Sequence, residues 1–139
     1  MEERFADTNY WFALFVPRDA LHQRAITAAS SVGSDTRIVT SDLVVIEVLN
    51  SLSSENIELK SKAVAVFESL WSERNIIVVP CSRELMKHSA ELYLRSSDKS
   101  WSFVDCSSFV IMRERKIHSA LTYDHHYEQA GFRALLRER

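Results

Sequence analysis

The sequence RFADTN at residues 4–9 decides the fold, because an apolar strand ends there on an acid that is followed at once by helix-starting residues. The pattern returns near the C-terminus in ALTYD at residues 120–124. Burying a carboxylate beside apolar strand residues is very costly without a partner. Asp7 and Asp124 therefore predict a shared site, with a divalent cation as the partner.

Strand-like and helix-like stretches alternate along the whole chain. We expect strands at residues 3–6, 37–40, 76–79 and 119–123, and an edge strand at 132–136. We expect helices at residues 10–15, 19–31, 43–52, 58–74, 82–95, 102–116 and 125–130. This alternation predicts an α/β fold: a three-layer α/β/α domain with a mostly parallel sheet of about four to five strands. Ligands of such sheets bind beyond the carboxyl ends of the strands, where Asp7 and Asp124 fall.

The composition fits a single domain over residues 1–139. Hydrophobic residues make up 46% of the chain, enough for a core of its own. The sequence has no apolar run of about 18 residues, as a membrane span requires, and nothing like a signal peptide, so we expect a cytoplasmic protein. Two cysteines are too few for a disulfide framework, and we expect both Cys81 and Cys106 to be reduced packing residues.

The net charge of −2 comes from 17 basic and 19 acidic side chains. If four of the acids surround a metal ion, 17 basic and 15 acidic side chains remain, and the rest of the chain is slightly positive. Such a mild charge neither supports nor excludes an RNA partner, so local clusters of basic residues matter more.

Two further acids lie among apolar residues. Glu47 falls inside VVIEVLN at residues 44–50 and shares a helix face with Leu43 and Asn50. Its apolar neighbours on both sides lead us to expect that it is largely buried and needs a cation or a hydrogen-bond donor. Asp105 lies in the first turn of a predicted helix, again among apolar residues.

Each of the four acids also has a purely structural interpretation. Asp7 and Asp124 could cap helices, Asp105 could offset a helix dipole, and Glu47 could pair with a buried arginine. One shared site explains all four together better than four separate coincidences. Mg²⁺ and Mn²⁺ prefer carboxylate oxygens, and such ions polarise phosphodiesters and activate water.

Three polar residues lie next to these acids. Thr122 is two residues before Asp124, so both side chains point to the same strand face. We expect Thr122, Thr8 and Asn9 to orient the carboxylates or a metal-bound water, with core packing or capping as the alternative for each.

These segments resemble the acidic motifs of the PIN-domain ribonucleases, especially the VapC-type toxins of toxin–antitoxin modules. The resemblance covers nearly the whole chain and runs through DTN at residues 7–9, TSDLVVIEVLN at 40–50, WSFVDCSSF at 101–109 and LTYDHHY at 121–127. It implies a PIN fold and a metal-dependent endoribonuclease. Its catalytic, metal-holding residues would be Asp7, Glu47, Asp105 and Asp124, with one or two Mg²⁺ or Mn²⁺ ions. The resemblance also implies an RNA substrate, frequent homodimers and a small antitoxin as inhibitor.

Two rival functions stay open at this point. A housekeeping RNA-processing nuclease would have the same acids but no antitoxin, and its expression would not arrest growth. A non-catalytic PIN scaffold for protein or RNA would not need four acids, and it would bind no Mn²⁺.

Outside the four acids, the sequence suggests only accessory sites. We expect Asp98 to lie in a solvated loop, with an accessory role as the alternative. The candidates for RNA contact are Arg95, Lys99, Arg113, Arg115 and Lys116 for phosphate, and Trp101 for base stacking. A solvated basic face and a core tryptophan are the alternatives.

The sequence leaves the roles of a histidine pair and of an apolar surface open. Adjacent residues on a helix point about 100° apart, so we expect His125 and His126 to be poor chelators together, with a role near the substrate as the alternative. Apolar side chains of residues 14–21 and of the helix at 58–74 suggest a groove for an antitoxin helix.

Overall fold

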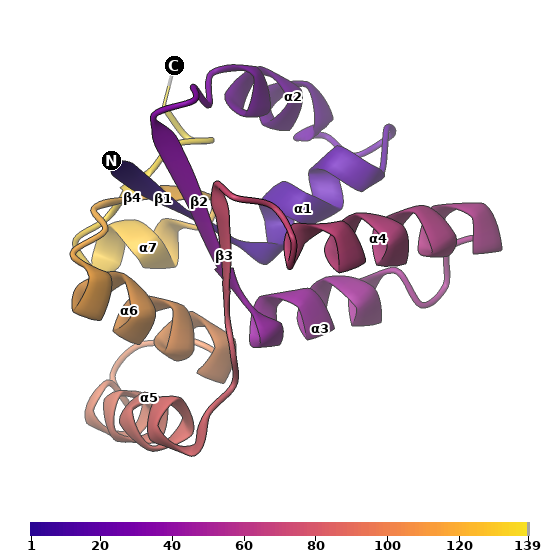
Figure 1. Cartoon of the computed structure of the whole chain (residues 1–139). Helices are drawn as coiled ribbons and strands as arrows, with labels where there is room; N and C mark the ends of the chain where they lie inside the picture. The colour runs from indigo at the N-terminus through magenta and orange to yellow at the C-terminus, as the bar shows by residue number, and fades with distance from the viewer. Residues whose placement is uncertain (139) are drawn as a thin grey trace.

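The computed structural model describes residues 1–138 and contains a five-stranded sheet in which every pair of neighbours is parallel (Figure 1). The strand order is β3-β2-β1-β4-β5. The strands are β1 (Glu2–Ala6), β2 (Thr36–Ser41), β3 (Ile76–Val79), β4 (Ser119–Leu121) and β5 (Arg133–Ala134).

Helices cover both faces of this sheet and complete the predicted three-layer α/β/α fold (Figure 1). One layer holds α1 (Thr8–Phe15), α2 (His22–Ser30), α3 (Asp42–Ser51) and α4 (Ile57–Leu70). The other layer holds α5 (Arg83–Arg95), α6 (Phe103–Arg115) and α7 (His125–Gln129). Right-handed crossovers produce this division, because the chain moves outward from β1 to β3 and then returns past β1 to β4.

The return of the chain places β1 and β4 side by side at the point where the strand order reverses. Phe5 lies opposite both Val39 and Ala120 in the register, and all three are fully buried. Such a reversal opens a crevice beyond the carboxyl ends of the two strands. Asp7 and Asp124 lie at this edge.

Local capping explains where the helices begin. The valine-rich run after residue 42 is a helix because Ser41 Oγ accepts a hydrogen bond from the Val44 N–H at 3.1 Å. In contrast, α2 starts at His22 and not at residue 19, because Asp19 Oδ2 accepts from the Leu21 N–H at 3.0 Å and holds a turn. The α4 helix is shorter than expected at its C-terminal end, where it stops at Leu70.

Two other expectations differ from the structure. The strand predicted over residues 119–123 ends at Leu121, since the next N–H groups bond to side chains: Tyr123 N–H donates to Asn9 Oδ1 and Asp124 N–H to Thr122 Oγ1. Cys106 is buried as expected, but Cys81 is exposed, because it lies in the connection after β3 and not in the core. None of the helices in residues 1–138 has the length and apolar character needed to cross a bilayer.

Candidate active site

Asp7 follows directly after β1 and has only 5% of its surface exposed. Its Oδ2 accepts a hydrogen bond from Thr122 Oγ1 at 2.9 Å, and its N–H donates to Leu121 O at 3.2 Å. Asp7 occupies the N-cap position of α1, but its side chain makes no capping hydrogen bond there, so capping alone does not explain why the acid is buried. No basic side chain among residues 1–138 offsets its charge.

The missing counter-charge affects the acidity of the site. Burial raises the pKa of Asp7 to about 7, and the negative charge of Asp105 adds to the rise, against hydrogen bonds from Thr8 and Thr122. Burial also raises the pKa of Asp105, and the charge of Asp124 adds to it. The three carboxyl groups therefore lie close enough to repel one another, and a cation between them would relieve both burial and repulsion.

Asp105 and Asp124 each have a structural bond as well. Asp105 forms a capping box with Ser102 at the start of α6, with both hydrogen bonds at 3.0 Å. Asp124 Oδ1 caps α7 by accepting from the His126 N–H at 2.9 Å. These bonds fix the two carboxyl groups without neutralising them, because the donors are uncharged N–H groups.

Glu47 enters the site from α3. It is partly exposed, so the expectation of a largely buried side chain is wrong: α3 lies at the rim of the crevice and turns this face toward it. Its carboxylate accepts a hydrogen bond from the Thr8 hydroxyl, and it has no arginine partner among the described residues.

A polar network joins the two strand ends beneath the carboxyl groups. Thr122 Oγ1 donates to Asp7 and accepts from the Asp124 N–H at 3.0 Å and from Asn9 Nδ2 at 3.3 Å. Asn9 Oδ1 in turn accepts from the Tyr123 N–H at 3.1 Å. Of the three polar residues singled out in the sequence, Thr8 and Thr122 thus bond to acids directly, and Asn9 holds Thr122.

The four acids line one pocket of about 370 Å³ at the carboxyl edge of the sheet. Within residues 1–138 its wall contains no lysine or arginine; it consists of Asp7, Thr8, Asn9, Phe12, Asp19, Leu21, Glu47, Ser51, Asp105 and Asp124. Oxygen donors alone, several of them charged, match the preference of Mg²⁺ and Mn²⁺. The residues present therefore fit a hard divalent cation held by Asp7, Glu47, Asp105 and Asp124.

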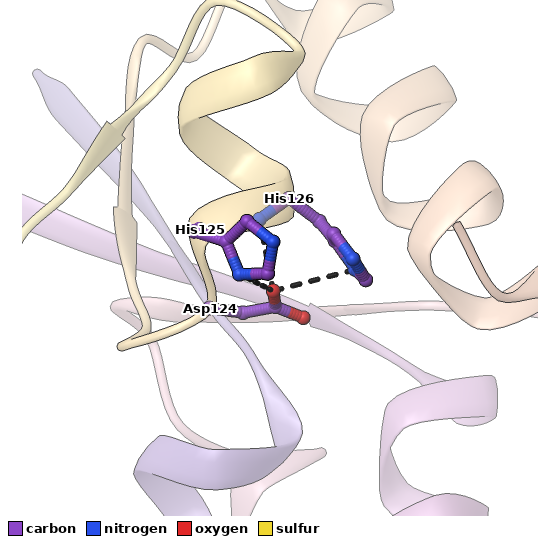
Figure 2. A group of neighbouring side chains, drawn as sticks. All are labelled: Asp124, His125 and His126. Carbon is purple, nitrogen blue, oxygen red and sulfur yellow. Dashed lines mark hydrogen bonds and ion pairs between the residues drawn. The ribbon is translucent and has the colours of Figure 1, made fainter. Parts of the chain in front are cut away.

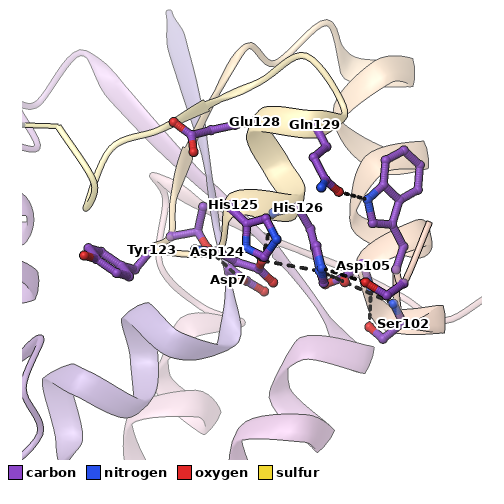
Figure 3. Close-up of polar contacts among 12 residues, drawn as sticks. Asp7, Ser102, Asp105, Tyr123, Asp124, His125, His126, Glu128 and Gln129 are labelled. Carbon is purple, nitrogen blue, oxygen red and sulfur yellow. Dashed lines mark hydrogen bonds and ion pairs between the residues drawn. The ribbon is translucent and has the colours of Figure 1, made fainter.

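Two residues near the acids did not stand out in the sequence. Asp19 lines the pocket, although its position after a proline in a turn gave no signal. His126 Nδ1 lies 3.0 Å from Asp105 Oδ2 and 3.3 Å from Asp124 Oδ1. Figure 3 shows His126 beside these two acids. Ideal helical geometry predicts that the two adjacent histidines point apart, so nothing in the sequence indicates that His126 contacts the acids.

The residues suggested for RNA contact do not gather around this pocket. Trp101 is 8% exposed, packs edge-on against Phe109 and donates its indole N–H to Gln129 Oε1 at 3.0 Å. Of its two interpretations, the structure supports the core tryptophan and not a ring available to stack on a base. Arg115 pairs with Glu3 at the opposite edge of the sheet, at 2.9 Å, and Lys116 ends the same helix.

The remaining RNA candidates are exposed. Arg113 lies in the last turn of α6, and Arg95 ends α5. Lys99 belongs to the loop between α5 and α6, which reaches the site through Ser100, whose Oγ lies 3.3 Å from His126 Nε2. Asp98 is in the same loop, exposed and paired with Lys99 at 3.0 Å.

Comparison with known proteins identifies the family. The chain matches the PIN domain family over residues 4–133. It belongs to this family. The PIN domain is 28% identical to the 23S rRNA-specific endonuclease VapC20 of Mycobacterium tuberculosis, over 92% of this chain and 94% of the relative.

Two solved structures share this fold. The crystal structure of the VapC20 toxin, described as cleaving the sarcin–ricin loop, superposes with a TM-score of 0.82 at 28% identity over 92% of this chain and 95% of that one. The fold also resembles FitAcB from Neisseria gonorrhoeae, with a TM-score of 0.59 at 17% identity and 94% of each chain covered.

Proposed function

We propose that this PIN domain is a Mg²⁺- or Mn²⁺-dependent endoribonuclease that hydrolyses RNA phosphodiester bonds and acts as the toxin of a toxin–antitoxin pair. The observation that carries the proposal is the buried carboxylate of Asp7, which faces Asp105 and Asp124 with no cation from the protein. A bound divalent cation would supply charge stabilisation for the phosphodiester and a more acidic water.

The residues of the chain would do the positioning. Thr122 would hold Asp7 in place through its hydrogen bond to Oδ2. Thr8 holds Glu47, and the Ser102 N–H holds Asp105 Oδ2. Because their supports are bonds to rigid strand and helix ends, the acids need little rearrangement when a cation and a phosphate enter.

The similarity to VapC20 suggests the class of RNA to test first. That relative is specific for 23S rRNA, and the similarity spans nearly all of both chains. We therefore propose RNA of the large ribosomal subunit as substrate, a small antitoxin as inhibitor, and a homodimer as the assembly. Exposed apolar side chains on α3 and α4, among them Ile46, Val64 and Trp71, give such partners a surface to cover.

The direct test compares wild type with Asp105→Asn on rRNA that carries a 5′ label, with Mn²⁺ or with EDTA. Wild type should cut at discrete positions only with metal. Asp105→Asn keeps an oxygen for the Ser102 bond but loses its charge, so the cleavage rate should fall at least about 100-fold, about 2.7 kcal/mol in the barrier. Glu68→Gln, an exposed change on α4, is the control and should cut like wild type.

Cleavage that persists in EDTA, or an Asp105→Asn protein as fast as wild type, would overturn the proposal. Expression in cells separates a toxin from a processing enzyme. A toxin should arrest growth when active and not when it carries Asp105→Asn, whereas a processing enzyme should leave growth unchanged in both forms.

A further inference from the structure

We propose that Asp124, His125 and His126 form a second metal site, suited to Zn²⁺ and similar borderline ions, that shares Asp124 with the all-oxygen pocket. The three side chains converge at the start of α7 (Figure 2). One ligand atom from each lies within 4.8 Å of the other two. The geometry contradicts the expectation that adjacent histidines on a helix point apart.

The cause of this convergence is the helix start. Asp124 is the residue before the first turn of α7, and its Oδ1 accepts the His126 N–H at 2.9 Å. The same oxygen lies 3.8 Å from His125 Nδ1 and 3.3 Å from His126 Nδ1. The two rings lean toward this carboxylate, with their centroids 4.5 Å apart.

These separations fit one small ion. With Zn–N and Zn–O bonds of about 2.0–2.2 Å, two donors of a tetrahedral ion lie roughly 3.3–3.6 Å apart. The two oxygen–nitrogen distances bracket that range, so small side-chain rotations complete the site. The side chain of His125 is 59% exposed, which leaves room for water in the remaining coordination positions.

The donor set distinguishes this site from the neighbouring pocket. Two imidazole nitrogens and one carboxylate favour Zn²⁺, Ni²⁺ or Cu²⁺ over Mg²⁺, whereas the pocket that contains Asp7 offers oxygens alone. Ser100 Oγ lies 3.3 Å from His126 Nε2 and can accept its N–H. A hydrogen bond in that direction puts the lone pair of the neutral ring on Nδ1, the arrangement typical of metal-binding histidines. Nδ1 faces Asp124 Oδ1 at 3.3 Å and Asp105 Oδ2 at 3.0 Å, and an ion bound to it would take the place of the Asp105 contact.

Sharing Asp124 gives the second site a consequence for activity, and this part of the inference rests on the proposed nuclease function. A Zn²⁺ ion that engages Asp124 Oδ1 and both imidazoles withdraws that carboxylate from the Mg²⁺ or Mn²⁺ pocket. Zn²⁺ should therefore suppress Mn²⁺-supported cleavage by binding at the Asp124–His125–His126 site and not by replacing Mn²⁺ in the acidic pocket. The site thus makes the enzyme sensitive to the kind of divalent metal present.

Metal binding is measured first, without RNA. Calorimetry with Zn²⁺ and visible absorption with Co²⁺ compare wild type, His125→Ala and His88→Ala. His88 is the matched control, since it is also a half-exposed histidine with an acidic neighbour, Glu114 at 3.3 Å, but lies outside the cluster. His125→Ala should weaken binding at least about tenfold and remove the Co²⁺ ligand-field bands, and His88→Ala should change neither. Equal affinities in all three proteins, or no Zn²⁺ binding by wild type, would overturn the site.

Cleavage is measured separately, with Mn²⁺ and increasing Zn²⁺. Wild type and His125→Ala should cut equally with Mn²⁺ alone, because His125 is not among the residues that line the acidic pocket. His125→Ala should need at least about tenfold more Zn²⁺ for half inhibition. The same inhibition in both proteins would refute the regulatory part. Binding of Zn²⁺ by a protein that never cuts RNA would refute the nuclease and leave the site standing.

Discussion

An acid lies at each end of strand β1, and the two acids have opposite electrostatic surroundings. At the start, Glu3 accepts hydrogen bonds from Arg115 at 2.9 and 3.0 Å and from Arg37 at 3.2 Å. The bond from Arg115, with the charges of both arginines, holds the pKa of Glu3 below its usual value. At the other end, Asp7 has only uncharged donors, and burial raises its pKa to about 7.

The difference separates an acid whose charge the fold neutralises from an acid whose charge it leaves unpaired. The fold brings Arg115 to Glu3 although the two residues are 112 positions apart in the sequence. The chain can therefore place an arginine beside an acid where the pair stabilises the fold. At Asp7 it supplies none, although the carboxyl group is far more deeply buried. A buried acid without a counter-charge is a cost to folding that a ligand cation removes. Arg115, a candidate for RNA contact in the sequence, is thus the ion-pair partner of Glu3 in the structure.

The strongest test of this contrast removes the charge at each end in turn and measures RNA cleavage with Mn²⁺. Asp7→Asn should lower the rate at least about 100-fold, because the proposed metal ligand is lost. Glu3→Gln should stay within about threefold of wild type, because its site is at the far edge of the sheet. Comparable losses in the two variants would mean that both ends serve the reaction, and the distinction would fail.

The second test concerns stability without metal, where Asp7→Asn should be the more stable protein. A folded-state pKa near 7 against 3.8 for the free side chain means that wild type loses stability as pH rises from about 4 to 7, and no more above that. At pH 8 the variant should gain about 1–3 kcal/mol, and below pH 4 nothing. Urea unfolding at both pH values measures it.

Adding Mn²⁺ should make wild type more stable than Asp7→Asn, the reverse of the order without metal. At about 100 times its dissociation constant, an ion stabilises the state it binds by about 2.7 kcal/mol, and wild type should gain this amount. Asp7→Asn should gain much less at the same concentration. If Mn²⁺ stabilises both proteins equally, Asp7 is not a ligand, and its burial needs another explanation.

The parts of the fold that the sequence predicts are those set by local chemistry. Ser41 begins α3 despite the valines that follow, and acids after short apolar strands mark the edge where β1 and β4 meet. Parallel topology then brings Asp7 and Asp124 together without further information, because both follow strands whose carboxyl ends share one edge.

The parts that failed depend on distant packing. Apolar neighbours suggested that Glu47 is buried, but the position of α3 at the rim decides its exposure. Trp101 had two interpretations in the sequence, a core residue or a base-stacking one, and only its packing against Phe109 and its bond to Gln129 decide for the core. The convergence of His125 with His126 depends on the turn that precedes the helix, which ideal helical geometry does not describe.

The smallest expected effect is the stability cost of removing the charge from Glu3. Glu3 is a partly buried acid with two arginine partners, and its ion pairs should contribute about 1 kcal/mol to the free energy of unfolding at pH 7. The lowered pKa means that this contribution is present above the ordinary value of 4.5 and is lost as pH falls through the folded-state pKa. Glu3→Gln should therefore unfold at lower urea than wild type at pH 7 and equally at pH 2.

Glu2→Gln is the matched control, because Glu2 is the neighbouring acid, is 57% exposed and meets a single arginine, Arg4, at 3.2 Å. Such an exposed pair contributes a few tenths of a kcal/mol at most, about 0.3 kcal/mol here. An equal cost for the two variants would show that the arginines around Glu3 add nothing beyond an ordinary surface pair. The two ends of β1 would then differ in burial alone, and the absence of a counter-charge at Asp7 would lose its meaning as a functional sign.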